Sequence, residues 1–197
     1  MSIALYDKAL LDKISTWTKD TNVHVYSVDQ TARLFEMELD EKNDKPIQFP
    51  LIGISRNGGY RVTVRGKRPM SFDGFTLDAS IKKSVQLNCI PISISYQLDV
   101  YTRYLEEADE ITRNLVFNII NYPKLTVQIP YNSQNCQIIL HDSNIRMEEE
   151  VSDNSGIPER LSLGQFTRLS IPLTVDDAYL WDTRVRNNLM LEWRLEE

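Results

Sequence analysis

The sequence predicts a single α+β domain over residues 1–197, with a mixed or antiparallel β-sheet flanked by an N-terminal helix and a central amphipathic helix. Apolar residues recur at spacings of three and four in Ile3–Trp17 and in Arg103–Asn121, which predicts a helix in each range. Apolar and polar residues alternate from Val85 to Tyr101, which is typical of a strand with one buried and one more polar face. No segment has the composition of a linker, so we expect one domain with long β-hairpin loops.

The composition is that of an ordinary globular protein, with 42% hydrophobic and 25% charged residues. The formal net charge is -6, which is opposite to the basic footprint of a sequence-independent DNA-binding protein. No apolar run approaches the ~20 residues of a membrane-spanning helix. We therefore expect neither a membrane nor a specific nucleic acid as partner.

The N-terminus and the cysteines predict a cytosolic protein. The first residues lack the basic stretch and apolar run of a secretory signal. Cys89 and Cys136 are too few for a disulfide framework, and we expect both thiols to stay reduced.

The first half of the chain predicts several strands before the long one. Apolar and polar residues alternate at Val23–Val28, Arg33–Leu39 and Tyr60–Arg65, and Ile47–Ser55 is a strand-like apolar run. Pro50 argues for an edge position or a bulge. Asn57-Gly58-Gly59 is a strong turn signal and predicts a hairpin between the last two strands. The pattern fails at Gly66–Ala79, which predicts a long irregular loop that makes contacts.

The central helix is predicted to begin after Thr102, whose side chain can cap it, and to end at Asn121-Tyr122-Pro123. Acidic residues near its start suit the positive end of the helix dipole, namely Glu106, Glu107, Asp109 and Glu110. The apolar stripe expected to face the core contains Tyr104, Ala108, Ile111, Leu115 and Ile119, with Val116 and Ile120 beside it.

The last third predicts further strands at Leu125–Ile129, Cys136–Leu140, Ile145–Val151, Gln165–Val175 and Leu189–Leu195. A turn at Asn132–Asn135, an exposed loop at Val151–Glu159 and a polar link at Trp181–Asn188 separate them.

The sequence contains few residue patterns that indicate catalytic chemistry. His141-Asp142 at a strand end is one candidate catalytic fragment, but such a pair is more often a surface or turn feature. Each cysteine lies among apolar strand residues, which favours inert thiols. Gly66-Lys67-Arg68 lacks the upstream glycine of a phosphate loop, and Pro69 replaces its Ser or Thr. We assign no catalytic, metal-binding or cofactor-binding residue and expect no enzymatic activity.

Four segments resemble tail terminator and tail-sheath-stabiliser (tail completion) proteins of contractile-tailed bacteriophages. They are Phe49–Arg56, Ile92–Arg103, Glu106–Ile111 and Asn121–Pro130, and with the N-terminal helix they are spread over Ile3–Pro130. The segment Gly66–Ala79 and the C-terminal β region have no counterpart in this resemblance.

The resemblance implies a non-enzymatic virion structural protein. Such proteins have a sheet flanked by helices and close into a hexameric ring that caps the tail tube at the neck. The implied partners are further copies of the chain in a homohexameric ring, the tail tube, the tail sheath and the neck or head-completion proteins. The implied location is the tail and neck of the virion, after assembly in the host cytoplasm. The alternatives are a head–tail connector or other neck subunit, and a small hydrolase or nuclease that uses His141 and Asp142.

A ring needs contacts in which one surface meets a different surface of the neighbour. The candidates are basic, aromatic and acidic side chains in loops and strand ends: Arg56, Arg61, Arg65, Lys67, Arg68, Phe72, Phe75, Glu148, Glu149 and Glu150. The basic and acidic groups are expected to pair between subunits. For the basic group the alternatives are a phosphate contact and a solvated hairpin face. For the acidic group they are a cation site and a solvated strand edge.

Overall fold

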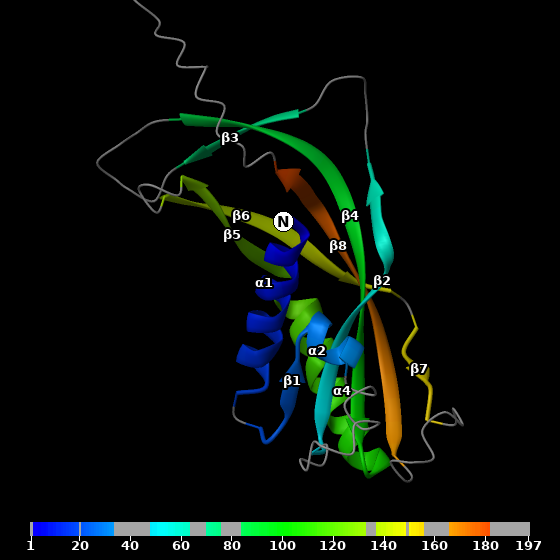
Figure 1. Ribbon diagram of the computed structural model, residues 1–197. Coiled ribbons are helices and arrows are strands. Elements are labelled where there is room, and N and C mark those ends of the chain that lie inside the picture. The colour runs from blue at the N-terminus through cyan, green and yellow to red at the C-terminus, as the bar shows by residue number, and fades with distance from the viewer. Residues whose placement is uncertain are drawn as a thin grey trace, which may run out of the picture.

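The computed structural model describes residues 2–19, 21–33, 48–63, 70–75, 84–132, 137–148, 150–155 and 166–181. The elements in these ranges are α1 (Ser2–Trp17), β1 (His24–Tyr26), α2 (Val28–Arg33), β2 (Leu51–Val62), β3 (Met70–Phe75), β4 (Ser84–Thr102), α4 (Leu105–Asn121), β5 (Lys124–Asn132), β6 (Gln137–Met147), β7 (Ser152–Asp153) and β8 (Thr167–Trp181) (Figure 1). The predicted α+β class is confirmed.

The strands form one mixed sheet in the order β1-β2-β4-β8-β6-β5, with β3 on the edge of β4 and β7 on the edge of β8. The β1–β2 pair is parallel, and all other pairs are antiparallel. The sheet curves into a half-barrel, and α1 and α4 lie inside the curve of β4 (Figure 1). The long strand β4 is therefore a central strand of the sheet, paired with β2, β3 and β8.

The core lies between the two helices and the inner face of the sheet. On β4, the buried inner side chains are Ile92, Ile94, Tyr96, Leu98 and Val100, as the alternation predicted. The helices contribute Tyr6, Leu10 and Ile14 from α1 and Ala108, Leu115 and Ile119 from α4. Burying each large apolar side chain contributes about 1.5–3 kcal/mol, so this interface is the main source of stability. The predicted N-terminal and central helices are both confirmed.

The hairpin predicted around Asn57-Gly58-Gly59 is wrong. β2 runs through this segment as a single strand and stays paired with β4. From the Arg56–Tyr96 pair to the Tyr60–Ile94 pair, the chain advances four residues on β2 and two on β4. The additional residues form a bulge, in which Gly58 takes a φ of 77° that side chains with a Cβ rarely adopt. β4 is long enough to pair with both predicted strands along the same edge.

Other boundaries also differ from the prediction. The helix α2 begins at Val28, where a strand was expected to end, because Ser27 and Gln30 form a capping box. The Gln30 amide donates to Ser27 Oγ over 3.3 Å, and the Ser27 amide donates to Gln30 Oε1 over 2.9 Å. β2 begins at Leu51, so Pro50 lies outside the strand.

Gly66–Ala79 was expected to be an irregular loop, but residues 70–75 form β3. β3 pairs with β4, and this pairing provides partners for the backbone amides and carbonyls of β3. β6 is one strand across the expected break after Leu140, and β8 continues beyond Val175 to Trp181. The expected loop Val151–Glu159 includes the short strand β7. Arg33, where the strand Arg33–Leu39 was expected to begin, is the last residue of α2, and the rest of that strand lies outside the described residues. The strand predicted at Leu189–Leu195 also lies outside them.

The start of α4 lacks the predicted side-chain cap. Tyr104 is the N-cap residue and makes no capping bond, while Thr102 Oγ1 donates to the Tyr104 carbonyl. Tyr104 and Ile120, which were placed in the buried stripe, are exposed. The helix ends at Asn121 as predicted.

Asp7 fastens α1 to the sheet. The buried Tyr96 hydroxyl donates to Asp7 Oδ1 over 2.9 Å, and Arg56 Nε lies 3.6 Å from the same oxygen. Burial raises the pKa of the Asp7 carboxyl above its ordinary value of 3.8, against the opposing effects of Tyr96 and Arg56. The folded state therefore binds more protons than the unfolded state just above pH 3.8, and this group's contribution to stability falls as the pH rises through that window.

We expect Asp7→Asn to change the free energy of unfolding near neutral pH by no more than about 0.5 kcal/mol, because its amide oxygen still accepts the Tyr96 hydroxyl. Asp7→Leu removes that acceptor and should cost about 1–3 kcal/mol. Urea unfolding measures both. On acidification towards the ordinary carboxyl pKa, wild type should gain stability relative to Asp7→Asn. Equal losses in the two variants would contradict the role of the Tyr96 hydrogen bond.

Candidate functional site

His141 and Asp142 do not form an acid–base pair. They are neighbours on β6, so their side chains point to opposite faces of the sheet. His141 is buried, with Nε2 2.8 Å from the Asp177 carbonyl and its ring edge-on to Tyr179 and Trp181. Asp142 is on the exposed face, where a hydrogen bond from Lys124 and one from Thr126 lower the pKa of its carboxyl. The pair that sequence reasoning singled out is thus divided between the core and the surface.

Cys89 lies on β4 in the core, and burial raises the pKa of its thiol. A raised pKa keeps the thiol protonated, and a protonated thiol is a poor nucleophile. Cys136 lies outside the described residues.

The predicted interface residues fall in three different settings. Arg56 is engaged with Asp7 in its own chain. Arg61 is exposed on β2 and pairs in register with Ser93, which places it on the outer face of the sheet. Glu148 accepts a hydrogen bond over 2.9 Å from Thr174 on the same outer face. One basic and one acidic candidate therefore share a face of a single subunit.

The other candidates are placed less fully. Glu150 is exposed. Phe72 and Phe75 are residues of the strand β3. Arg65, Lys67, Arg68 and Glu149 lie outside the described residues. The pairing of basic with acidic residues between subunits stays a prediction.

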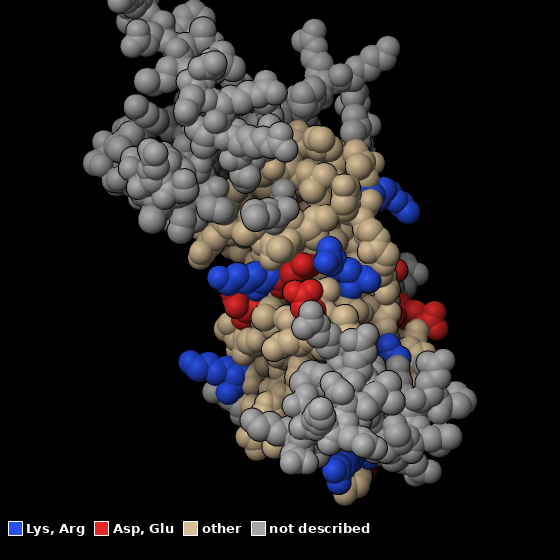
Figure 2. All heavy atoms as spheres, viewed as in Figure 1, with Lys and Arg blue, Asp and Glu red and all other residues tan. Residues whose placement is uncertain are grey.

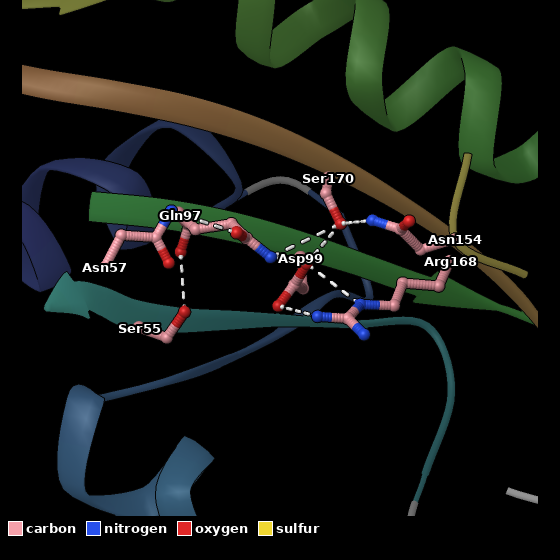
Figure 3. A network of polar contacts seen from close by, with 7 residues as sticks. All are labelled: Ser55, Asn57, Gln97, Asp99, Asn154, Arg168 and Ser170. Carbon is pink, nitrogen blue, oxygen red and sulfur yellow. Dashed lines mark hydrogen bonds and ion pairs between the residues drawn. The ribbon is translucent and has the colours of Figure 1, made fainter. Parts of the chain in front are cut away.

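The outer face also holds a buried ion pair that sequence reasoning missed. Arg168 donates two hydrogen bonds to Asp99, from Nε over 3.0 Å and from Nη2 over 2.8 Å. Ser170 and Gln97 donate to the same carboxylate. Figure 3 shows the Asp99 carboxylate at the centre of these donors, which come from β4 and β8. Burial alone would lower the pKa of Arg168, but the hydrogen bonds and charge of Asp99 outweigh it and raise the pKa.

This ion pair belongs to a network that holds β7 on the sheet. Asn154 donates to Ser170 Oγ over 2.8 Å, and the Arg168 amide donates to Ser155 Oγ over 3.0 Å. A hollow of about 620 Å³ lies beside it, lined by α2, β2 and Arg168. Asp99 binds the Arg168 guanidinium through two hydrogen bonds. The network therefore acts as a clamp that joins β4, β8 and the residues just after β7.

A second hollow, of about 730 Å³, lies where β1, Phe49-Pro50 and the first half of α4 meet. Its charged lining mixes Arg103 with Glu107 and Glu110. Within the described ranges, no three His, Cys, Asp or Glu side chains are grouped as a metal site requires. Among the described helices, none has the length and apolarity to cross a membrane.

The outer face of α4 exposes large apolar side chains. Phe117 is 62% exposed and Ile120 is 64% exposed, one turn apart, and Tyr122 follows just after the helix. Sequence reasoning overlooked Phe117. At about 100° per residue, Phe117 and Ile120 lie about 200° and 140° from the buried Leu115, so a helical projection would have placed both on the outer face.

The far end of β2 exposes a second apolar group. Tyr60 is 43% exposed and Val62 is 49% exposed, and Ile90 on the neighbouring β4 is also exposed. Their pairing with Ile94 and Ile92 places Tyr60 and Val62 on the inner face of the sheet. Figure 2 shows charged side chains of described residues in a band across the middle of the molecule, with a mostly uncharged surface above it. We call this end of β2, with Ile90, the arm.

No protein-family model and no curated protein matches the chain. The fold and its surfaces define a half-barrel α+β domain with two unlike exposed apolar surfaces, one on α4 and one on the arm.

Proposed function

We propose that the protein is a non-enzymatic virion structural protein, a ring subunit of the tail terminator or tail-sheath-stabiliser kind. In this role, copies of the chain form a ring that caps the tail tube and contacts the sheath and the neck. The observation that carries the proposal is the presence of two unlike apolar surfaces, on α4 and on the arm. Exposed apolar groups of this kind mark sites of protein contact.

Unlike surfaces suit a ring. When one surface of a subunit meets a different surface of the next, the contact repeats around a closed circle or along a filament. A two-fold dimer would instead use one surface that matches itself. The geometry thus favours a repeating assembly.

The segments that resemble tail completion proteins support the proposal because they form one structural unit. They fall on β2, β4, α4 and β5. β2 pairs with β4, α4 packs on β4, and β5 follows α4 directly. Residues that carry the resemblance therefore build the centre of the fold.

Electron microscopy of purified tailed particles, with an antibody or a fused tag on this chain, tests the proposal. We expect label in a ring between the last sheath layer and the neck. Label on the head side of the neck would favour the head–tail connector alternative. Particles that lack the chain altogether, together with turnover of a small substrate by the purified protein, would overturn the proposal.

A further inference from the structure

The hollow beside the Asp99–Arg168 pair has walls that are fixed in place. It has a volume of about 620 Å³, with one wall on α2 and another at Arg168. The α2 wall sits directly on β2 because Gly53 has no side chain, and a Cβ there would lie 2.9 Å from Thr31 Cγ2. The other wall is held by the two hydrogen bonds from Arg168 to Asp99. Cavities of this size hold small molecules, and fixed walls lower the cost of binding one.

Asp99 occupies only one edge of the Arg168 guanidinium. It accepts from Nε and Nη2, which leaves three of the five N–H donors of the side chain. Within the described part of the chain, no group accepts from the third nitrogen, Nη1, which Figure 3 shows without a dashed line. The edge formed by Nη1 and Nη2 is therefore open. Two parallel N–H donors at such an edge match the two oxygens of a carboxylate.

The guanidinium stays charged and fixed although Asp99 lies beside it. Gln97 and Ser170 also donate to the Asp99 carboxylate, so four hydrogen bonds share its negative charge. The Tyr101 ring lies 5.6 Å from Arg168 Cζ and supports the guanidinium from its face. The positive charge of Arg168 is thus held in one position beside the hollow.

The rest of the lining supplies hydroxyl groups and apolar contacts. Ser55 Oγ and Thr31 Oγ1 donate to backbone carbonyls over 3.5 and 3.4 Å, which is long for a hydrogen bond. Either hydroxyl can therefore turn to a ligand oxygen at little cost. Val28 and Ala32 of α2 add an apolar wall.

We propose that this hollow binds the carboxylate group of a small organic acid. The carboxylate accepts from Nη1 and Nη2 of Arg168, and the hydroxyls of Ser55 and Thr31 donate to its oxygens. The apolar body of the acid lies against Val28 and Ala32. An acidic side chain of a protein presents the same group, so the test below separates the two sources. The site goes beyond the proposed ring and does not depend on it.

Titration with benzoate, followed by NMR of the backbone amides, tests the site. We expect saturable shifts at Thr31, Ser55 and Gly58, which line the hollow, and none at Lys8 on α1. Benzamide has the same shape but no charge, and it should bind at least about tenfold more weakly because it cannot accept from both guanidinium nitrogens as an anion does. N-acetylglutamate amide carries the carboxylate on a protein side chain and should bind more weakly than benzoate.

Two variants connect the binding to the hollow. Arg168→Lys keeps a positive charge beside Asp99 but removes the planar fork, and it should weaken benzoate binding at least about tenfold. Ala32→Phe fills the hollow from an exposed position on α2 and leaves the ion pair intact. It should abolish the shifts, and it keeps the test decisive if Arg168→Lys does not fold.

The matched control is Arg146→Met. It removes an arginine that is exposed on β6 and lies outside the hollow, so benzoate should bind this variant as it binds wild type. Thermal unfolding verifies that each variant is folded.

The outcomes decide the site separately from the proposed function. The absence of saturable shifts, equal binding of benzamide, or unchanged binding to Ala32→Phe would overturn the carboxylate site. Tighter binding of N-acetylglutamate amide than of benzoate would overturn the small acid as its occupant. The ring at the neck is tested by labelled particles and stands or falls independently.

Discussion

Replacing Tyr6 by alanine should destabilise the protein by about 3–5 kcal/mol, the usual cost of deleting a buried aromatic ring. Tyr6 is fully buried between α1 and the sheet. Its hydroxyl also replaces a missing strand partner: it accepts from the Tyr179 amide over 2.8 Å and donates to the Tyr179 carbonyl over 3.3 Å. β6 pairs with β8 only between residues 173 and 176, so Tyr6 binds the backbone beyond that point.

Tyr6→Phe separates the ring from the hydroxyl. The phenyl ring keeps the packing but leaves the Tyr179 amide and carbonyl without this partner, which should cost about 1–3 kcal/mol. Urea unfolding with a constant slope measures both variants. A Tyr6→Phe variant as stable as wild type would show that water satisfies the Tyr179 backbone equally well.

The second large effect is expected at the buried ion pair. Arg168→Met leaves the Asp99 carboxylate buried without its cation, and breaking such a pair costs about 3–5 kcal/mol. The side chains of Arg168 and Asp99 are only 14% and 3% exposed. A double variant, Asp99→Leu with Arg168→Met, should recover a large part of the loss, because an apolar pair carries no buried charge.

The exposed ion pair between Arg146 and Asp176 gives a matched control. Its side chains are 65% and 39% exposed, so Arg146→Met should cost less than about 1 kcal/mol. Chemical unfolding of the three variants compares the same substitution in two settings. Equal losses from Arg146→Met and Arg168→Met would contradict the clamp described for Asp99 and Arg168.

The parts of the fold that the sequence predicted well have strong periodic patterns. The alternation through β4 and the spacing in α1 recur over many residues, so no competing structure fits them. Asn57-Gly58-Gly59 is different, because a glycine with positive φ suits a turn and a bulge equally well. The choice depended on β4, which offers one continuous edge to both predicted strands, and local residues do not carry that information.

The candidate surfaces were only partly predictable. The Ser27–Gln30 capping box and the outward position of Phe117 were readable from local spacing but were overlooked. The Asp99–Arg168 pair was not readable, since its members are far apart in the chain and meet only because β4 and β8 are neighbours. Arg56 was predicted as an interface residue, but only the packing of α1 reveals its partner Asp7.

The most direct measurement of the proposed role is electron microscopy of particles assembled without this chain. A ring that caps the tube and joins it to the neck implies that its loss yields tails of uncontrolled length or tails that do not attach to heads. Normal tails joined to heads in the absence of the chain would contradict the assembly role.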